Sequence, residues 1–477
     1  MKHSIELRTA VAAAVLVFAF AMSGLAQQSG PGSPKGVSLQ SAPSGVPSAP
    51  GTLFIPQSSQ PQTVPAGHYF AAHTNVEIFI PHGLNPDEAP PFPGYGYETP
   101  ASIACHYGLV TTSASPNCNP NSTTVNPTGG SQTIAIVDAY DDPAAPGDLA
   151  WFSDVFGLPL SASQFQVVWA NTKASSCGWL GYLPTDYTGG WEVEESLDIE
   201  WAHAMAPSAK IYLVEACSNY DSDLQQAVLV ANNLVQCGNP ENNSGGVGTC
   251  PAGSTGKGEV SMSWGGGEFY GENASDACAT MDDSCFTKPG VVYFAASGDS
   301  PGVVYPCTSP NVVCAGGTTM RRNAATFNFL QEAGWVFGGG GQSSIETIPS
   351  YQSTYIPSAC STHRCVPDLS FDADPYTGVY VYDTFPIEGI YYYEWLVVGG
   401  TSVSAPSLAG IVNTAGNFAT SQGAEAAWIY YFSGPTFAGG YFTDITNGFC
   451  GFYMGFSAPA GYDFCTGVGV DKGYYAK

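Results

Sequence analysis

The 477-residue chain carries 39 acidic and 12 basic residues, which gives a formal charge of −27 at pH 7. A surface of this kind repels phosphate groups, so the charge argues against nucleic acid and anionic membranes as partners. With 44% hydrophobic residues the chain can bury a large core. The charge by itself fits an enzyme that works at acidic pH and a merely soluble acidic protein equally well.

The first 26 residues have the organisation of a secretory signal peptide. An apolar run from Ala10 to Met22 follows a basic start, and Gly24-Leu25-Ala26 is a small-x-small cleavage site. No later stretch approaches the roughly 20 apolar residues that a spanning helix needs, so we expect a secreted protein outside the membrane. Residues 27–97 are rich in Ser, Pro, Gly and Gln, which favours an extended leader or short pro-region over a domain.

From residue 98 to the C-terminus, short apolar runs alternate with amphipathic stretches, which is typical of an α/β domain. Several runs are too continuously apolar to have a solvated face, so they suit the strands of a buried parallel sheet. The predicted strands are Thr133 to Asp138, Lys210 to Glu215, Val260 to Trp264, Val291 to Ala296 and Val312 to Ala315. The predicted helices are Asp142 to Phe156, Glu194 to Met205, Tyr220 to Val235 and Ser402 to Phe418.

The 14 cysteines are an even number, and export would place them where disulfides persist. Metal clusters are the weaker interpretation. Pairing each cysteine with its neighbour in sequence gives one candidate connectivity, which the sequence by itself leaves open. These pairs are Cys105/Cys118, Cys177/Cys217, Cys237/Cys250, Cys278/Cys285, Cys307/Cys314, Cys360/Cys365 and Cys450/Cys465.

Ser402 lies where a glycine turn is expected to enter a helix, within Gly399-Gly400-Thr401-Ser402-Val403-Ser404-Ala405-Pro406. A hydroxyl at this point lies in the positive field of a helix N-terminus, with backbone N–H groups close by. These are the surroundings of a catalytic nucleophile. The alternative is a helix cap, which is the commoner use of a serine that begins a helix.

A nucleophilic serine needs a base, and the usual base is histidine. None of the seven histidines lies in the His-Gly-Thr-His setting of subtilisins. Glu194 and Asp198 offer a different base, because residues four apart share one face of a helix. Two carboxylates in contact cannot both ionise comfortably, so the charged member can accept a serine proton below neutrality. The alternative is a solvated acidic face, but the apolar residues Trp201 to Ala206 that follow indicate burial.

Asp299 provides a third carboxyl group, in Ala295-Ala296-Ser297-Gly298-Asp299 directly after a buried-looking strand. Loops at the carboxyl ends of parallel strands are where α/β folds place their sites. Considered alone, Asp299 has the features of an ordinary turn residue.

Taken together and in this order, the three segments resemble those of the sedolisin family of serine-carboxyl peptidases, which are relatives of subtilisin. GGTSVSAP is similar to the nucleophile segment of that family, EESLD to its Glu-x-x-x-Asp pair, and ASGD to the segment that holds its oxyanion aspartate. Weaker matches are TIAIVDAYDDP, SMSWGGGE, GGGGQSS and VPDLSFDADP. The resemblance covers most of residues 98 to 473.

The resemblance implies a role for each of these groups and an overall fold. Ser402 would be the nucleophile, Glu194 its general base, Asp198 the partner of Glu194, and Asp299 the oxyanion-hole donor. Asp138 falls where some members have a further carboxylate. The implied fold is a single large subtilisin-like α/β domain over residues 98–477, with a mostly parallel sheet flanked by helices. The implied substrates are polypeptides, and we expect a monomer.

Family members also bind one structural Ca²⁺ near the C-terminus, and Asp444-Ile445 with Ala460-Gly461-Tyr462-Asp463 resembles that site. Calcium prefers six to eight oxygen ligands. The implied ligands are the carboxylates of Asp444 and Asp463 and the backbone carbonyls of Ile445, Pro459 and Gly461. Pro459 stands where the family usually has glycine.

The sequence leaves other functions open. Paired carboxylates and 13% aromatic residues would also suit an acid glycosidase, although that leaves the glycine turn at Ser402 unexplained. A secreted binding protein that kept a peptidase fold and lost its activity is a second alternative. Within the peptidases, endopeptidase action is favoured over tripeptide release only by the habit of the family. Its members also carry a long folded prodomain, where this chain has only residues 27–97.

Overall fold

The computed structural model describes the chain from Gly51 onward. Every described residue belongs to the second of two units, residues 36–477, and the predicted signal peptide lies outside the described residues. The described ranges are 51–82, 90–91, 97–110, 125–170, 176–177, 182–238, 241–242, 246–247, 249–274, 278, 281–323, 326–388, 390, 394–418, 423–434, 440–452 and 455–475.

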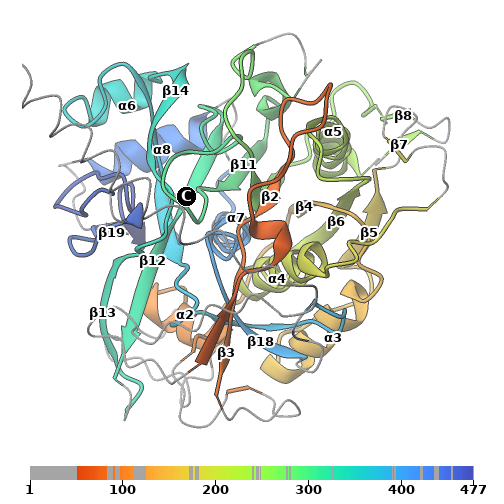
Figure 1. Cartoon of the computed structure of the whole chain (residues 1–477), viewed down its shortest axis with the longest axis horizontal. Helices are drawn as coiled ribbons and strands as arrows, with labels where there is room; N and C mark the ends of the chain where they lie inside the picture. The colour runs from red at the N-terminus through yellow and green to blue at the C-terminus, as the bar shows by residue number, and fades with distance from the viewer. Residues whose placement is uncertain are drawn as a thin grey trace, which may run out of the picture. The chain divides into compact units, whose positions relative to one another are not determined.

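A mostly parallel sheet forms the centre of this unit (Figure 1). Within the described ranges it has ten strands in the order β19-β20-β16-β12-β11-β9-β4-β6-β5, with β13 paired to β12. Only the β12–β13 and β19–β20 pairings are antiparallel. The strands are β4 (Thr133–Ala139), β5 (Phe165–Trp169), β6 (Lys210–Ala216), β9 (Gly258–Met262), β11 (Val291–Ala296), β12 (Val312–Arg322), β13 (Phe329–Gly334), β16 (Leu369–Asp372), β19 (Phe442–Thr443) and β20 (Val470–Asp471).

Helices cover both faces of this sheet because its strands are apolar on both sides. In β4, Ile134 and Ile136 pack in the same cluster as α4 and α7, whereas Ala135 and Val137 pack with α5. This alternation is the period of two that a strand imposes. The helices are α2 (Pro100–His106), α3 (Ala145–Phe156), α4 (Gly190–Met205), α5 (Asp221–Cys237), α6 (Ser350–Tyr355), α7 (Ser404–Ala415) and α8 (Ala424–Ser433), with 3₁₀ turns η1 (Gln57–Ser59) and η2 (Asp283–Phe286).

The predicted fold class is confirmed, with shifted boundaries at several elements. Strand β11 has the predicted bounds, whereas β12 continues seven residues past Ala315 to Arg322, because its second half pairs with β13. The predicted strand from Val260 to Trp264 is divided between β9 and a short strand β10 (Trp264–Gly265). The last predicted helix begins two residues after Ser402 and ends earlier, at Ala415.

Residues 51–82, which the sequence assigned to a leader, contribute strands to this unit. β1 (Gly51–Phe54) and β3 (Glu77–Pro81) belong to a four-stranded antiparallel sheet with β17 (Val379–Tyr382) and β18 (Trp395–Gly399). β2 (His73–Thr74) pairs antiparallel with β10. Figure 1 shows β2 and β3, in red and orange, running down the middle of the view beside α4. Two further two-stranded sheets pair β7 (Glu241–Asn242) with β8 (Gly246–Val247), and β14 (Gly341–Thr347) with β15 (His363–Val366).

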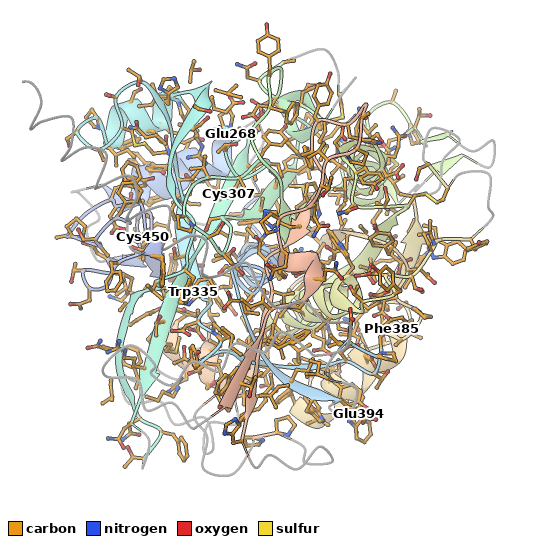
Figure 2. The ribbon with its side chains drawn as sticks, viewed as in Figure 1. Glu268, Cys307, Trp335, Phe385, Glu394 and Cys450 are labelled. Carbon is orange, nitrogen blue, oxygen red and sulfur yellow. A yellow bond between two sulfur atoms is a disulfide. The ribbon has the colours of Figure 1, made fainter. Side chains whose placement is uncertain are left out.

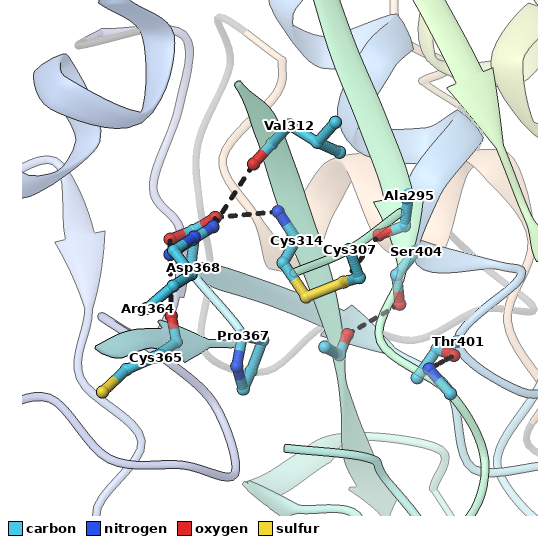
Figure 3. Close-up of a disulfide and its surroundings, with 12 residues drawn as sticks. Ala295, Cys307, Val312, Cys314, Arg364, Cys365, Pro367, Asp368, Thr401 and Ser404 are labelled. Atoms are coloured by element: carbon cyan, nitrogen blue, oxygen red, sulfur yellow. Dashed lines mark hydrogen bonds and ion pairs between the residues drawn. A yellow bond between two sulfur atoms is a disulfide. The ribbon is translucent and has the colours of Figure 1, made fainter. Parts of the chain in front are cut away.

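Six of the seven predicted cysteine pairs are present as disulfides, and Cys118 of the seventh lies outside the described residues. They are spread through the unit, as the labelled Cys307 and Cys450 illustrate (Figure 2). The Cys307–Cys314 bridge lies beside the buried ion pair of Arg364 and Asp368 (Figure 3). Within the described ranges, no helix combines the length and the apolar character that crossing a membrane requires.

Candidate active site

Ser402 lies in a turn between β18 and α7, and its side chain does not cap the helix. The residue that precedes α7 is Val403, whose side chain makes no capping hydrogen bond. The Ser402 hydroxyl instead donates to the carbonyl oxygen of Ser263, at 3.0 Å. Gly400 has a φ of 102°, a left-handed conformation that glycine adopts without strain, and it turns the chain into this position. The structure therefore does not support the helix-cap interpretation of Ser402.

Glu194 and Asp198 lie one turn apart on α4, and both are fully buried. Asp198 accepts a hydrogen bond of 2.8 Å from the Ser263 hydroxyl, whereas no described residue makes a well-aligned hydrogen bond to either Glu194 oxygen, although the Ser402 hydroxyl lies near enough to lower the pKa of Glu194. Ser263 thus connects the two halves of the site, because its carbonyl accepts from Ser402 and its hydroxyl donates to Asp198. The complete burial of α4 rules out the alternative of a solvated acidic face and agrees with the burial expected from the sequence.

Burial and mutual repulsion favour the protonated forms of these carboxyl groups. Burial raises the pKa of Glu194 well above its usual range, and the charge of Asp138 adds to this, while the Ser402 hydroxyl acts in the opposite direction. Burial, followed by the charges of Asp138 and Glu194, likewise raises the pKa of Asp198. Asp138, at the end of β4, is fully buried, and burial raises its pKa to about 8. One ionisation in this group therefore holds the remaining members protonated.

Asp299 follows β11 and faces the turn that holds Ser402. One of its oxygens accepts hydrogen bonds of 2.8 Å from both the backbone N–H and the hydroxyl of Thr401. The other oxygen, Oδ2, is buried and has no partner among the described residues. Burial raises the pKa of Asp299 to about 7, although the hydrogen bonds from Thr401 lower it. Below that pH the carboxyl group carries a proton that Oδ2 can donate.

The backbone of Asn75 lies directly against Ser402, which the sequence did not indicate. The Ser402 N–H donates to the Asn75 carbonyl oxygen at 3.2 Å, and the Asn75 N–H donates to the Ser402 hydroxyl oxygen at 3.2 Å. A Cβ added to Gly400 would fall 2.0 Å from the Asn75 oxygen and 2.5 Å from Asp299 Oδ2. The carbonyl oxygen, the Ser402 amide and the unpaired Asp299 oxygen therefore converge on one point, as the groups of an oxyanion hole do.

Glu77 is a second residue that sequence reasoning missed. It is 5% exposed, and its Oε2 has no partner among the described residues. Burial raises its pKa well above the usual range, and the charges of Asp299 and Asp374 add to this. The one sequence signal near Asn75 and Glu77 is the apolar patch from Val76 to Pro81, which stands in a stretch whose composition is otherwise that of a linker.

Of the predicted calcium ligands, the structure brings Asp444, Gly461 and Asp463 close together. Asp444 Oδ2 accepts the Gly461 N–H at 2.8 Å, and Asp463 Oδ1 accepts the backbone N–H groups of Cys465 and Thr466. Burial raises the pKa of Asp463 to about 6, and the charge of Asp444 contributes to this. Two carboxylates close enough to repel each other fit a divalent cation. Within the described ranges no three or more His, Cys, Asp or Glu side chains form a metal-binding group, so carbonyl oxygens or water would complete the set.

Three curated proteins are similar to parts of this chain. Kumamolisin from Bacillus sp. (strain MN-32) is 31% identical over 308 residues, which are 60% of this chain and 48% of kumamolisin. Sedolisin from Pseudomonas sp. (strain 101) is 31% identical over 186 residues, covering 36% of this chain and 29% of sedolisin. Xanthomonalisin from Xanthomonas sp. (strain T-22) is 30% identical over 183 residues, covering 34% and 20%. The chain thus spans about half of kumamolisin and less of the other two, and no family model matches it.

Among solved structures, a complex of Pseudomonas sedolisin, a serine-carboxyl proteinase, with two molecules of pseudo-iodotyrostatin is similar to this one. The TM-score is 0.57 at 21% sequence identity, and the match covers 79% of this chain and 95% of the other. At this identity the structural likeness concerns the fold.

Proposed function

We propose that this chain is a member of the sedolisin family, to whose proteins it is similar, and that it is a secreted serine-carboxyl endopeptidase that hydrolyses polypeptides at acidic pH. The observation that carries the proposal is the peptide backbone at Ser402. The Asn75 carbonyl accepts the Ser402 N–H and lies beside Asp299 Oδ2, which is where the carbonyl of a bond under attack would lie. The same observation distinguishes a peptidase from a glycosidase.

In the proposed mechanism Ser402 Oγ attacks the substrate carbonyl carbon while its proton passes to charged Glu194. The oxyanion that forms accepts hydrogen bonds from the Ser402 N–H and from protonated Asp299. Glu194 returns the proton to the leaving amine, the peptide C–N bond breaks, and an acyl-enzyme on Ser402 remains. Water then cleaves the ester by the same proton transfers in reverse order. The hydrogen bond from Ser263 fixes Asp198 in place. Asp198 in turn shares a proton with Glu194 and positions it.

The proposed endopeptidase mode is supported by the path of residues 70–81. This segment continues on both sides of Ser402, with β2 paired to β10 before Asn75 and β3 paired to β18 after it. A site that holds more than three residues before the carbonyl has no barrier that would restrict it to releasing tripeptides.

The proposed acidic optimum is supported by the two ionisations that the mechanism needs. Asp299 must keep its proton, and its pKa near 7 makes this possible only below neutrality. Glu194 must lose its proton, and burial raises its pKa, so its group ionises above the usual range near 4.

The six disulfides are consistent with secretion, since disulfides persist in oxidising compartments. We propose in addition one structural Ca²⁺ on the loops of Asp444 and Asp463.

The test is hydrolysis of a denatured protein at pH 4 by the full chain and by the Ser402→Ala variant. Ser407→Ala is the matched control, because Ser407 lies on α7 and its buried hydroxyl has no partner among the described residues. We expect product peptides from the parent and the control, and none from Ser402→Ala. If no chain hydrolyses the protein, the alternative of a silent binding protein is favoured.

A further inference from the structure

Residues 70–76 lie along the site as a bound peptide would. Ala72 exchanges two hydrogen bonds of 2.7 Å with Asn219, through its backbone N–H and its carbonyl oxygen. β2 then pairs antiparallel with β10, with Thr74 opposite Trp264 and His73 opposite Gly265. Backbone pairing of this kind gives affinity for any extended peptide, and pockets for individual side chains give the specificity. The pockets that hold side chains of this segment therefore indicate which substrate side chains the site prefers.

One side chain of this segment is anchored in an aromatic pocket. Phe70 is 1% exposed, and its ring centroid lies 5.8 Å from that of Phe269, 6.3 Å from Tyr305 and 6.4 Å from Trp264. Distances between 4.5 and 7 Å are those of interacting aromatic pairs. The flanking Tyr69 stacks on the outer side of the pocket, with its ring centroid 4.8 Å from that of Phe269, but it is 49% exposed, so Phe70 is the aromatic residue of this segment that is buried.

Gly266 makes the space for this ring. A Cβ added there would lie 2.6 Å from Phe70 Cδ2 and 2.7 Å from Cγ, so any larger residue would collide with the aromatic side chain. Gly266 is not among the glycines with positive φ, so its backbone conformation does not require glycine. The ring therefore explains Gly266, whereas the next residue, Gly267, has nothing within 4 Å of an added Cβ.

We propose that the pocket of Gly266, Trp264, Phe269 and Tyr305 is a substrate subsite for an aromatic side chain. The side chain belongs to the residue five positions before the one whose carbonyl lies at Ser402, as Phe70 lies five positions before Asn75. This proposal rests on the proposed function, because it names the substrate of the same site. It makes the enzyme select polypeptides by a residue remote from the bond that is cleaved.

The test compares two synthetic peptides hydrolysed at pH 4 by the full-length Phe70→Ala chain, in which the chain's own ring does not fill the pocket. One has the sequence of residues 67–80, and the other is identical except for alanine at the position of Phe70. Burial of a phenylalanine ring corresponds to a preference of about 10- to 100-fold in kcat/KM for the first peptide. We expect the difference mainly in KM, because a ring already seated in the pocket before attack contributes equally to binding the substrate and the transition state. Mass spectrometry should place cleavage after the asparagine.

Two variants locate the preference in the pocket. Both are made in a Phe70→Ala chain, so that the chain's own ring is absent. Gly266→Ala should reduce the ratio of the two kcat/KM values toward one, whereas Gly267→Ala should leave the ratio as it is in the Phe70→Ala chain. A ratio near one in the Phe70→Ala chain, with hydrolysis that depends on Ser402, overturns the subsite and leaves the proposed function standing. Failure of the parent chain to hydrolyse either peptide overturns the proposed function and the subsite with it.

Discussion

The backbone amide of Ser402 donates a hydrogen bond of 3.2 Å to the carbonyl oxygen of Asn75, a residue 327 positions earlier in the chain. This contact places a peptide carbonyl between the amide of a buried serine and the unpaired oxygen of Asp299. In the proposed mechanism this is the position of the carbonyl under attack, so each neighbouring carboxyl group has a defined role to test.

Glu194→Gln should lower turnover by about 10²- to 10⁴-fold, because an amide of nearly the same shape cannot accept the proton of Ser402. The measurement is kcat on a peptide at pH 4, with circular dichroism to verify the fold. Glu195→Gln is the matched control: it is the same change one residue along the buried helix, in a side chain whose charged neighbours are led by Glu215. If Glu195→Gln abolishes turnover and Glu194→Gln spares it, the proton acceptor has been assigned to the wrong residue.

The pH–rate profile should be a bell on the acidic side of neutrality. Activity should rise as the Glu194 group ionises and fall as pH passes the pKa of Asp299, near 7, because an ionised Asp299 repels the developing oxyanion. Asp299→Asn keeps a donor at every pH, so it should lose part of the alkaline decline. Asp299→Ala should lose on the order of 100-fold or more in turnover. A wild-type optimum at or above pH 8, or undiminished turnover in Asp299→Ala, is incompatible with this role.

The free energy of unfolding should fall as the pH rises from about 4 to 8. Burial raises the pKa of Asp138 to about 8 and that of Asp299 to about 7, whereas in an unfolded chain such groups ionise near 4. Between these values the folded state binds more protons, so stability declines with pH. Thermal melting of the Ser402→Ala chain, which cannot digest itself by this mechanism, measures the effect.

Asp138→Asn in the Ser402→Ala chain isolates one contribution to that decline. Removing the ionisable group should make the decline between pH 4 and 8 shallower. Asp154→Asn, an exposed position on α3, should leave the slope unchanged. A melting temperature that rises steadily from pH 4 to 8 would contradict the assignment of buried, protonated carboxyl groups.

A calcium chelator should lower the melting temperature of the chain. Without a cation, the charges of Asp444 and Asp463 oppose each other, which contributes to the raised pKa of Asp463. Asp444→Asn relieves the repulsion and removes a ligand, so this variant should melt at the same temperature with chelator and with added Ca²⁺. Equal melting of the parent chain under both conditions, at pH 6 or above, would show that these loops hold no stabilising ion.

The sequence by itself determined the elements whose side chains carry a pattern. The four-residue spacing of Glu194 and Asp198 predicted one helix face, and α4 is a buried helix that holds both. The continuous apolar runs predicted the parallel strands β4, β6 and β11, because a strand buried on both faces has no polar alternation. The neighbouring cysteines predicted six disulfides that the structure contains.

Only the tertiary structure placed Asn75 at Ser402 and Glu77 beside Asp299. The segment that contains them resembled a linker, because strands such as β2 are held by backbone hydrogen bonds, which leave no mark on the side-chain sequence. The register of β2 on β10 and of β3 on β18 decides which carbonyl meets the serine, and a shift of one residue would present a different one. The same register places Phe70 against Gly266, so the position of the aromatic subsite also depends on pairing between segments far apart in the chain.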